Sequence, residues 1–268
     1  MWNSRRSAVA WRRHGWKVVT LAAALDMSVA AHSAAQTIEL PFDVGERLRY
    51  RVQVGKLGTI GEGEMSVSGP VDVRGTQTLV LRSEIRAKFG FVKTTDRAES
   101  WIDPKRMAAL RYEKRTHGAF SRDDDQRVEL YPDDRRWQDE NGRSGQSPTA
   151  APLDELSFIY FLRTLPLASD TVARVVRHYD PARNPIAVRV MGRDTLRTKA
   201  GTFATIVVEM RVKDPRRYGG EGVIRMHLSD DAYRYPVRIE SSVPVLGATV
   251  LTLESYTRPP EHFASRPE

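Results

Sequence analysis

Regular alternation of polar and apolar side chains is the feature of this sequence that most restricts its fold. From residue 47 to residue 54, four apolar residues alternate with three arginines and a glutamine. A period of two is typical of a β-strand with one face in water and the other face buried. A pairing shift of one residue would bury the arginines, so the pattern also fixes the strand register.

The same alternation recurs along the chain, and clusters of Gly, Pro, Asp and Asn that favour turns lie between the segments. Gly58, Gly61 and Gly63 open the second segment and are expected to introduce curvature or a bulge. We therefore predict a mainly β protein, a curved antiparallel sheet or half-barrel of about ten to twelve strands. Strands are expected at residues 47–54, 61–68, 81–86, 97–102, 110–115, 186–190, 202–210, 223–228, 237–241 and 249–256.

One segment departs from this period. Residues 152–166 are predicted to form a helix, because Asp154 and Glu155 suit a helix start and Pro166 suits its end. The helix is apolar around most of its circumference, so we expect it to pack on the concave face of the sheet. The polar segment 139–151 before it is rich in Gly, Ser and Pro and is expected to be a flexible connection.

Two interpretations of this helix stay open. If it fills the concave face, its side chains are core; if it is a movable lid, the same side chains line a site for a hydrophobic ligand. The candidate ligand-binding residues are Tyr50, Val52, Phe158, Tyr160, Phe161 and Leu162.

Residues 1–35 have the pattern of a secretory signal. Five basic residues precede the short apolar run 18–25, and small residues precede Gln36. The run is shorter than the roughly 20 residues that span a bilayer. We predict cleavage near Ala35–Gln36, which leaves one β-rich domain over 36–268; an amphipathic or anchored N-terminal helix is the alternative.

Cleavage there would lower the formal charge from +8 to +4, since the leader holds five basic residues and one acidic residue. Nucleic acid is therefore not an expected partner. The sequence from Lys88 to Lys93 places a glycine between two phenylalanines, which could stack on bases, but a β-turn flanked by apolar residues explains it better in an exported protein.

The sequence offers little catalytic chemistry. Cysteine and the Gly-x-Ser-x-Gly motif are absent, which excludes a thiolate nucleophile and Cys-ligated zinc. His227 with Asp230 and Asp231 could serve a metal site or a hydrolase, but a strand followed by an Asp-rich turn explains these residues as well. The aspartate run 123–125 indicates a solvated turn. We expect no catalytic residue, no metal and no cofactor.

Three patches together carry a family resemblance. They are PFDVGERLRY at 41–50, LDELSFIYFLR at 153–163 and LSDDAYRYPVRI at 228–239, in that order along the chain. Over about residues 39–257 the sequence resembles the exported bacterial proteins grouped as domain of unknown function 3108. The resemblance implies a mainly antiparallel β protein of the cell envelope; it implies no activity and no catalytic residue.

The expected function is that of an exported, non-enzymatic module that binds an amphipathic or lipid-like envelope component. A structural or protein-interaction module without a small ligand is the first alternative, and a hydrolase is the second. The expected partner is a hydrophobic ligand or an envelope protein, close to the membrane but without a membrane-spanning segment in the mature chain.

Overall fold

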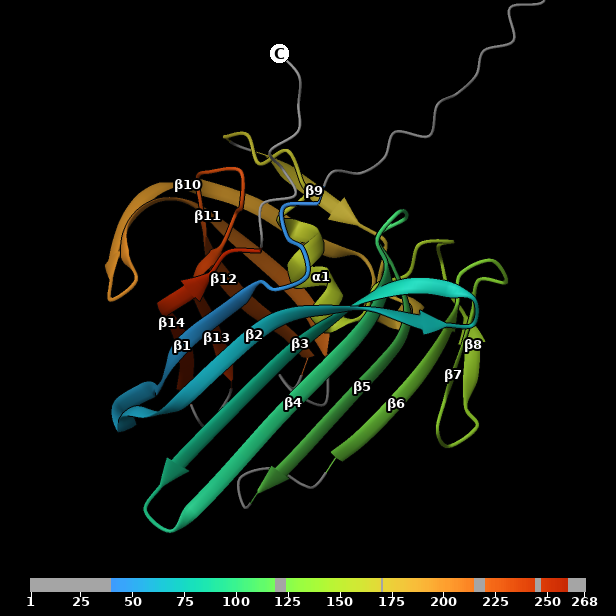
Figure 1. Ribbon diagram of the computed structural model, residues 1–268, viewed down its shortest axis with the longest axis horizontal. Helices are drawn as coiled ribbons and strands as arrows, with labels where there is room; N and C mark the ends of the chain where they lie inside the picture. Colours follow the sequence, from blue (N-terminus) through green and yellow to red (C-terminus); the bar gives the residue numbers. More distant parts are fainter. Residues whose placement is uncertain (1–39, 119–123, 170, 215–219, 244–246, 260–268) are drawn as a thin grey trace, which may run out of the picture. The chain divides into compact units, whose positions relative to one another are not determined.

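A single antiparallel sheet curves around one short helix in the described part of the chain (Figure 1). The computed structural model describes residues 40–118, 124–169, 171–214, 220–243 and 247–259. The predicted leader and its cleavage site lie outside these residues. No helix in the described ranges has the length and hydropathy needed to cross a membrane.

The sheet contains fourteen strands, in the order β8-β7-β6-β5-β4-β3-β2-β1-β14-β13-β12-β11-β10-β9. The two ends of the domain sequence therefore pair at the centre of the sheet, and the sheet is open because β8 and β9 form its two edges. The strands are β1 (Arg47–Val54), β2 (Gly58–Val73), β3 (Thr76–Phe89), β4 (Val92–Asp103), β5 (Ala108–Gly118), β6 (Asp124–Tyr131), β7 (Arg136–Asp139), β8 (Ser144–Gln146), β9 (Val172–Val175), β10 (Ile186–Thr198), β11 (Gly201–Asp214), β12 (Gly220–Ser229), β13 (Pro236–Val243) and β14 (Gly247–Thr257). Two 3-10 turns, η1 (Gly55–Leu57) and η2 (Pro181–Arg183), and the helix α1 (Glu155–Leu162) complete it.

The mainly β, antiparallel fold is confirmed, but the expected ten to twelve strands were too few. All ten expected segments are strands, whereas β6, β7, β8 and β9 had not been expected. Three of these have only three or four residues, too few to show a period. The fourth, β6, begins in the aspartate run that was interpreted as a turn. The polar segment 139–151 contains β8, which pairs with β7.

The alternation in β1 matches its burial. Leu48, Tyr50 and Val52 face the core and are buried, whereas Arg47 and Arg49 face water and each lie 3.3 Å from Glu64 on β2. Pairing between β1 and β2 is irregular beyond Val52, where the register skips one residue of β2. This bulge lies beside Gly61, as the glycine spacing had predicted.

Helix α1 is shorter than expected because its ends are fixed by side chains. Asp154 is the N-cap: one carboxylate oxygen accepts hydrogen bonds from the N–H groups of Leu156 and Ser157, both at 2.9 Å, and the Ser157 hydroxyl accepts from the Asp154 N–H. The other carboxylate oxygen accepts from the Ser100 hydroxyl of β4 at 2.6 Å. The N-terminus of the helix is thereby held against the sheet.

A buried ion pair holds the other end of the helix. Arg163 follows α1 directly, and its guanidinium donates two hydrogen bonds of 2.7 Å to the carboxylate of Glu46. Both side chains are 0% exposed. Arg163 also donates to the carbonyl oxygens of Pro41 and Tyr233 and lies over the ring of Phe42, 5.1 Å from its centroid. The donors of this buried cation are thus matched by acceptors, as a buried charge requires.

Candidate ligand-binding cleft

The six residues proposed from the sequence gather around α1, mostly in the core. Tyr50, Val52, Phe158, Tyr160 and Leu162 are each exposed by 2% or less, and Phe161 is half-buried with the Arg177 guanidinium 4.5 Å from its ring centroid. The Tyr50 hydroxyl donates to the Pro236 carbonyl at 2.9 Å. Such burial is what the core interpretation expects of these side chains; their part in binding a ligand stays a prediction.

An apolar pocket of about 110 Å³ lies between the helix and β10, β11 and β12. Three of its lining residues, Glu155, Phe158 and Ile159, come from α1. The opposite wall consists of aliphatic side chains that leave the strands on the concave side: Ile186, Met210, Val212 and Ile224. The pocket lining is therefore largely apolar, and it also includes Glu155, His178, Arg183, Lys213 and Asp214.

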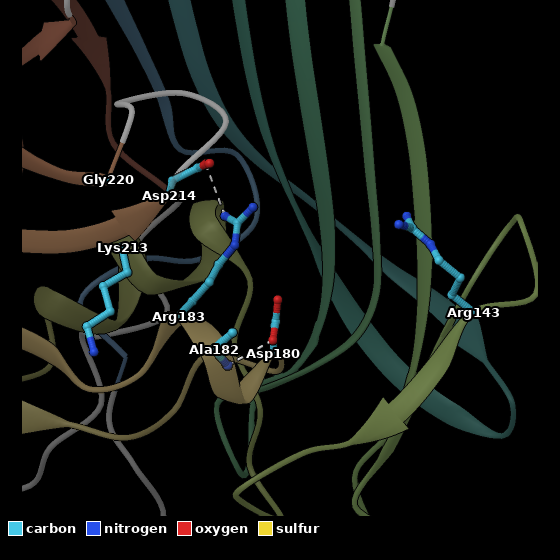
Figure 2. A pocket seen from close by; sticks show the side chains of 7 residues that line it. All are labelled: Arg143, Asp180, Ala182, Arg183, Lys213, Asp214 and Gly220. Carbon is cyan, nitrogen blue, oxygen red and sulfur yellow. Dashed lines mark hydrogen bonds and ion pairs between the residues drawn. The ribbon is translucent and has the colours of Figure 1, made fainter.

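A wider charged cleft of about 560 Å³ adjoins this pocket. Asp180 and Arg183 come from the η2 turn, and Lys213 and Asp214 come from the end of β11. Figure 2 shows Arg143, from the turn between β7 and β8, across the cleft from these residues. The pocket and the cleft share Arg183, Lys213 and Asp214, so they form one site with an apolar end and a charged mouth.

The η2 turn is built to hold Arg183 at this mouth. Asp180 caps the turn by accepting from the Ala182 N–H at 2.9 Å. Asn184 ties the loop together, since its side chain accepts from the His178 N–H at 3.0 Å and donates to the carbonyl oxygens of His178 and Asp180, both at 2.9 Å. These hydrogen bonds fix the conformation of the loop that carries the Arg183 guanidinium.

Arg183 stands between two carboxylates. Its Nη1 contacts Glu155 at the start of α1 and lies 3.3 Å from Asp214 of β11. Burial opposes ionisation of Glu155, but His178 and Arg183 stabilise the carboxylate and hold the pKa of Glu155 well below its usual range. Glu155 is thus an anion at neutral pH, and the ion pairs link the helix to η2 and β11.

Two polar atoms at this rim have no hydrogen-bond partner within the described residues: Oε2 of Glu155 and Nε2 of His178. His178 accepts the Asp180 N–H at Nδ1, 3.1 Å away, and its Nε2 lies 3.7 Å from Oε1 of Glu155. Glu155 is 37% exposed as a side chain although Oε2 itself is buried. Both atoms are buried, and both residues line the apolar pocket and not the charged cleft.

The residues considered for hydrolysis or metal binding make contacts within the protein. His227 lies 3.9 Å from Asp194, and burial lowers its pKa. Asp230 pairs with Arg193 at 2.8 Å, and Asp231 accepts from the backbone of the turn that follows. Across the described ranges, no three His, Asp or Glu side chains stand together as metal ligands would.

A further hollow of about 640 Å³ lies over the same turn and the end of α1. Its lining includes Arg163, Asp230 and Asp231. The charged groups of this hollow are paired within the protein, as Arg183 is in the cleft. Unlike the cleft, the hollow has no lining residue in common with the apolar pocket.

Comparison with known structures supports the fold. A crystal structure of a β-barrel-like protein of domain of unknown function DUF1849 from Brucella abortus has a TM-score of 0.57 at 10% identity, covering 83% of this chain and 100% of that one. A protein with a YmcC-like fold from Bacteroides fragilis (11% identity, TM-score 0.33) and a lipoprotein candidate from Parabacteroides distasonis (10% identity, TM-score 0.31) give the same coverage, but these scores are too low to indicate a common fold.

Comparison with curated proteins finds no match. The family model described as protein of unknown function (DUF3108) matches residues 49–254, which is more than half of the chain. The matched region runs from within β1 to within β14, and it includes the helix α1 and the cleft residues. The chain therefore belongs to the DUF3108 family, as the three sequence patches had indicated.

Proposed function

We propose that this chain is an exported, non-enzymatic protein of the cell envelope that binds an amphipathic, lipid-like component in the cleft between α1, η2 and β10–β12. The observation that carries the proposal is the union of an apolar pocket and a charged cleft through Arg183, Lys213 and Asp214. A ligand with an apolar end and a polar end would place each in a matching environment.

The sizes of the two parts favour a particular kind of ligand. Their volumes, about 110 and 560 Å³, together fall in the range of roughly 300–1,000 Å³ typical of small-molecule sites. The apolar part admits only a short apolar group while α1 keeps its place, and Ser100 and Glu46 anchor the two ends of that helix. A longer chain would have to extend into the charged cleft or displace the helix.

Export is supported by the basic, apolar and small-residue order of residues 1–35. A protein delivered to the envelope meets amphipathic molecules in abundance, which fits a cleft of this character. The absence of a catalytic motif in the sequence supports a binding role instead of a chemical one.

Titration with the apolar, anionic fluorophore anilinonaphthalene sulfonate tests the proposed site. The Ile224→Phe variant adds bulk to the wall of the apolar pocket and should abolish the fluorescence increase without lowering the melting temperature. Val172→Phe, on the exposed edge strand β9, is the matched control and should bind the dye as the unaltered protein does. Equal dye binding by Ile224→Phe and the unaltered protein would count against this site.

A protein-interaction role is the second candidate, and one observation favours it. The edge strand β9 pairs with β10 on one side, and Val172 in it is 68% exposed. Edge strands with exposed apolar residues readily accept a further strand from a partner. Cross-linking in cells from a photoreactive residue at position 172 should then capture a protein, and a Val172→Lys substitution should abolish the product.

A further inference from the structure

The hairpin between β3 and β4 extends beyond the strands on either side of it. In the described part of the sheet, β2 pairs with β3 no further than Ala87, and β5 pairs with β4 no further than Thr94. Residues 88–93 therefore form a two-stranded tip that is paired only with itself (Figure 1).

This tip presents one large apolar side chain to water. Phe91 is 105% exposed, the highest value among the exposed large hydrophobic residues of the described chain. Gly90 before it has a φ of +61°, a conformation that glycine adopts without strain, so the turn is well suited to its sequence. Full exposure of a phenylalanine leaves its apolar surface in water, and entry into an apolar phase would be favourable.

Two lysines stand directly behind Phe91. Lys88 and Lys93 are opposite one another in the β3–β4 register, where like charges oppose pairing. The pair is therefore poorly explained by the stability of the hairpin and well explained by an external anionic surface. The neighbouring tip, η1, exposes another apolar residue, Leu57.

Antiparallel hairpins place the β1–β2 and β3–β4 turns at one end of the sheet and the β2–β3, β4–β5, β6–β7 and β12–β13 turns at the opposite end. The turns at the opposite end carry both signs of charge: Asp72 and Arg74 share the β2–β3 turn, and Asp103 and Arg106 share the β4–β5 turn. Residues 88–93, in contrast, include two lysines and no acidic residue.

We propose that the β3–β4 tip docks this protein on an anionic lipid surface, with Phe91 entering the interface and Lys88 and Lys93 beside the headgroups. An aromatic residue flanked by basic side chains is the combination that partitions into the boundary of anionic bilayers. The inference does not depend on the ligand cleft, which lies at α1 and β10–β12.

Vesicle co-sedimentation of the purified protein tests this docking. The protein is purified from cells, so that any cleavage of the predicted leader has already taken place. Vesicles of phosphatidylcholine mixed with phosphatidylglycerol should bind the protein, whereas vesicles of phosphatidylcholine alone should bind it much more weakly. Removal of the apolar group in Phe91→Ser should lower the partition coefficient by roughly tenfold or more. The Lys88→Gln/Lys93→Gln double variant should lower it by a similar factor on anionic vesicles only.

Val71→Ser is the matched control, because it removes an exposed apolar group beside the β2–β3 turn, at the opposite end of the sheet; its partition coefficient should change by about twofold at most. Circular dichroism verifies that each variant keeps its β-sheet spectrum, which is expected because the substituted side chains contact solvent. Partitioning of Phe91→Ser equal to that of the unaltered protein would overturn the proposal. Absence of binding of the unaltered protein to anionic vesicles would overturn it as well.

Discussion

Breaking the ion pair between Glu46 and Arg163 should destabilise the domain far more than breaking a surface pair. The Arg163→Met variant keeps an apolar stem but leaves the Glu46 carboxylate buried without its cation, and it also frees the carbonyl oxygens of Pro41 and Tyr233. Both charged side chains are 0% exposed, so water cannot replace the lost partner without opening the structure. Removal of one partner of such a pair costs about 3–5 kcal/mol.

For a domain of this size, that cost corresponds to a fall in melting temperature of roughly 6–20 °C. Urea unfolding followed by tryptophan fluorescence gives the free energy directly. The matched control is Arg49→Met, since Arg49 is 63% exposed and lies 3.3 Å from Glu64; its loss should stay below about 1 kcal/mol.

A double variant separates the charge from the packing. Adding Glu46→Gln to Arg163→Met removes the unpaired carboxylate, so the double variant should be more stable than Arg163→Met alone. A loss for Arg163→Met no larger than that for Arg49→Met would refute the reasoning that this pair fastens the end of α1 to the sheet.

Two further predictions concern backbone packing and pH. In Gly61→Ala the new Cβ would lie 2.0 Å from the Arg86 carbonyl oxygen, so urea unfolding should show a free energy of unfolding that is lower by about 2 kcal/mol or more. In the control Gly63→Ala the nearest neighbours are side chains at 3.6 Å, and the free energy of unfolding should fall by less than about 1 kcal/mol. Similar losses in the two variants would contradict this prediction. Burial raises the pKa of Asp154 from 3.8 to about 6 against its hydrogen bonds, so the folded state keeps a proton that the unfolded state loses. The contribution of Asp154 to the free energy of unfolding should therefore fall by up to roughly 3 kcal/mol as the pH rises from below 4 to above 6, whereas Glu155, whose pKa is lowered, contributes in the opposite direction. The difference in free energy of unfolding between the unaltered protein and Asp154→Asn should change with pH accordingly, and a difference that stays constant from about pH 4 to pH 7 would contradict it.

The strands that pattern alone could predict are the long ones. The expected bounds 47–54 coincide with β1, because its alternation runs without interruption and its arginines can face only water. The edge strands β7, β8 and β9 have three or four residues each, and their pairing depends on neighbouring strands that a local pattern does not reveal. The helix could be located because its apolar residues do not alternate with polar ones, as they do in the flanking strands.

The cleft could not be predicted either, because its residues lie far apart in the sequence. Arg143, Arg183 and Lys213 come from three turns or strand ends far apart in the sequence, and the curvature of the sheet brings them to one site. The apolar residues of α1 were visible in the sequence, but the pattern could not separate core from cavity lining. Arg163 is a single cation that directly follows the eight residues of α1. That position indicates a buried acidic partner, which was not predicted from the sequence.

Native mass spectrometry of the protein, gently purified from the cells that produce it, tests the proposed amphipathic cleft most directly. We expect part of the unaltered protein to carry an added lipid-like mass, and we expect Ile224→Phe to lack that mass while it keeps its fold. A spectrum in which the unaltered protein appears only without a ligand, or in which Ile224→Phe carries the same added mass, would contradict the proposal.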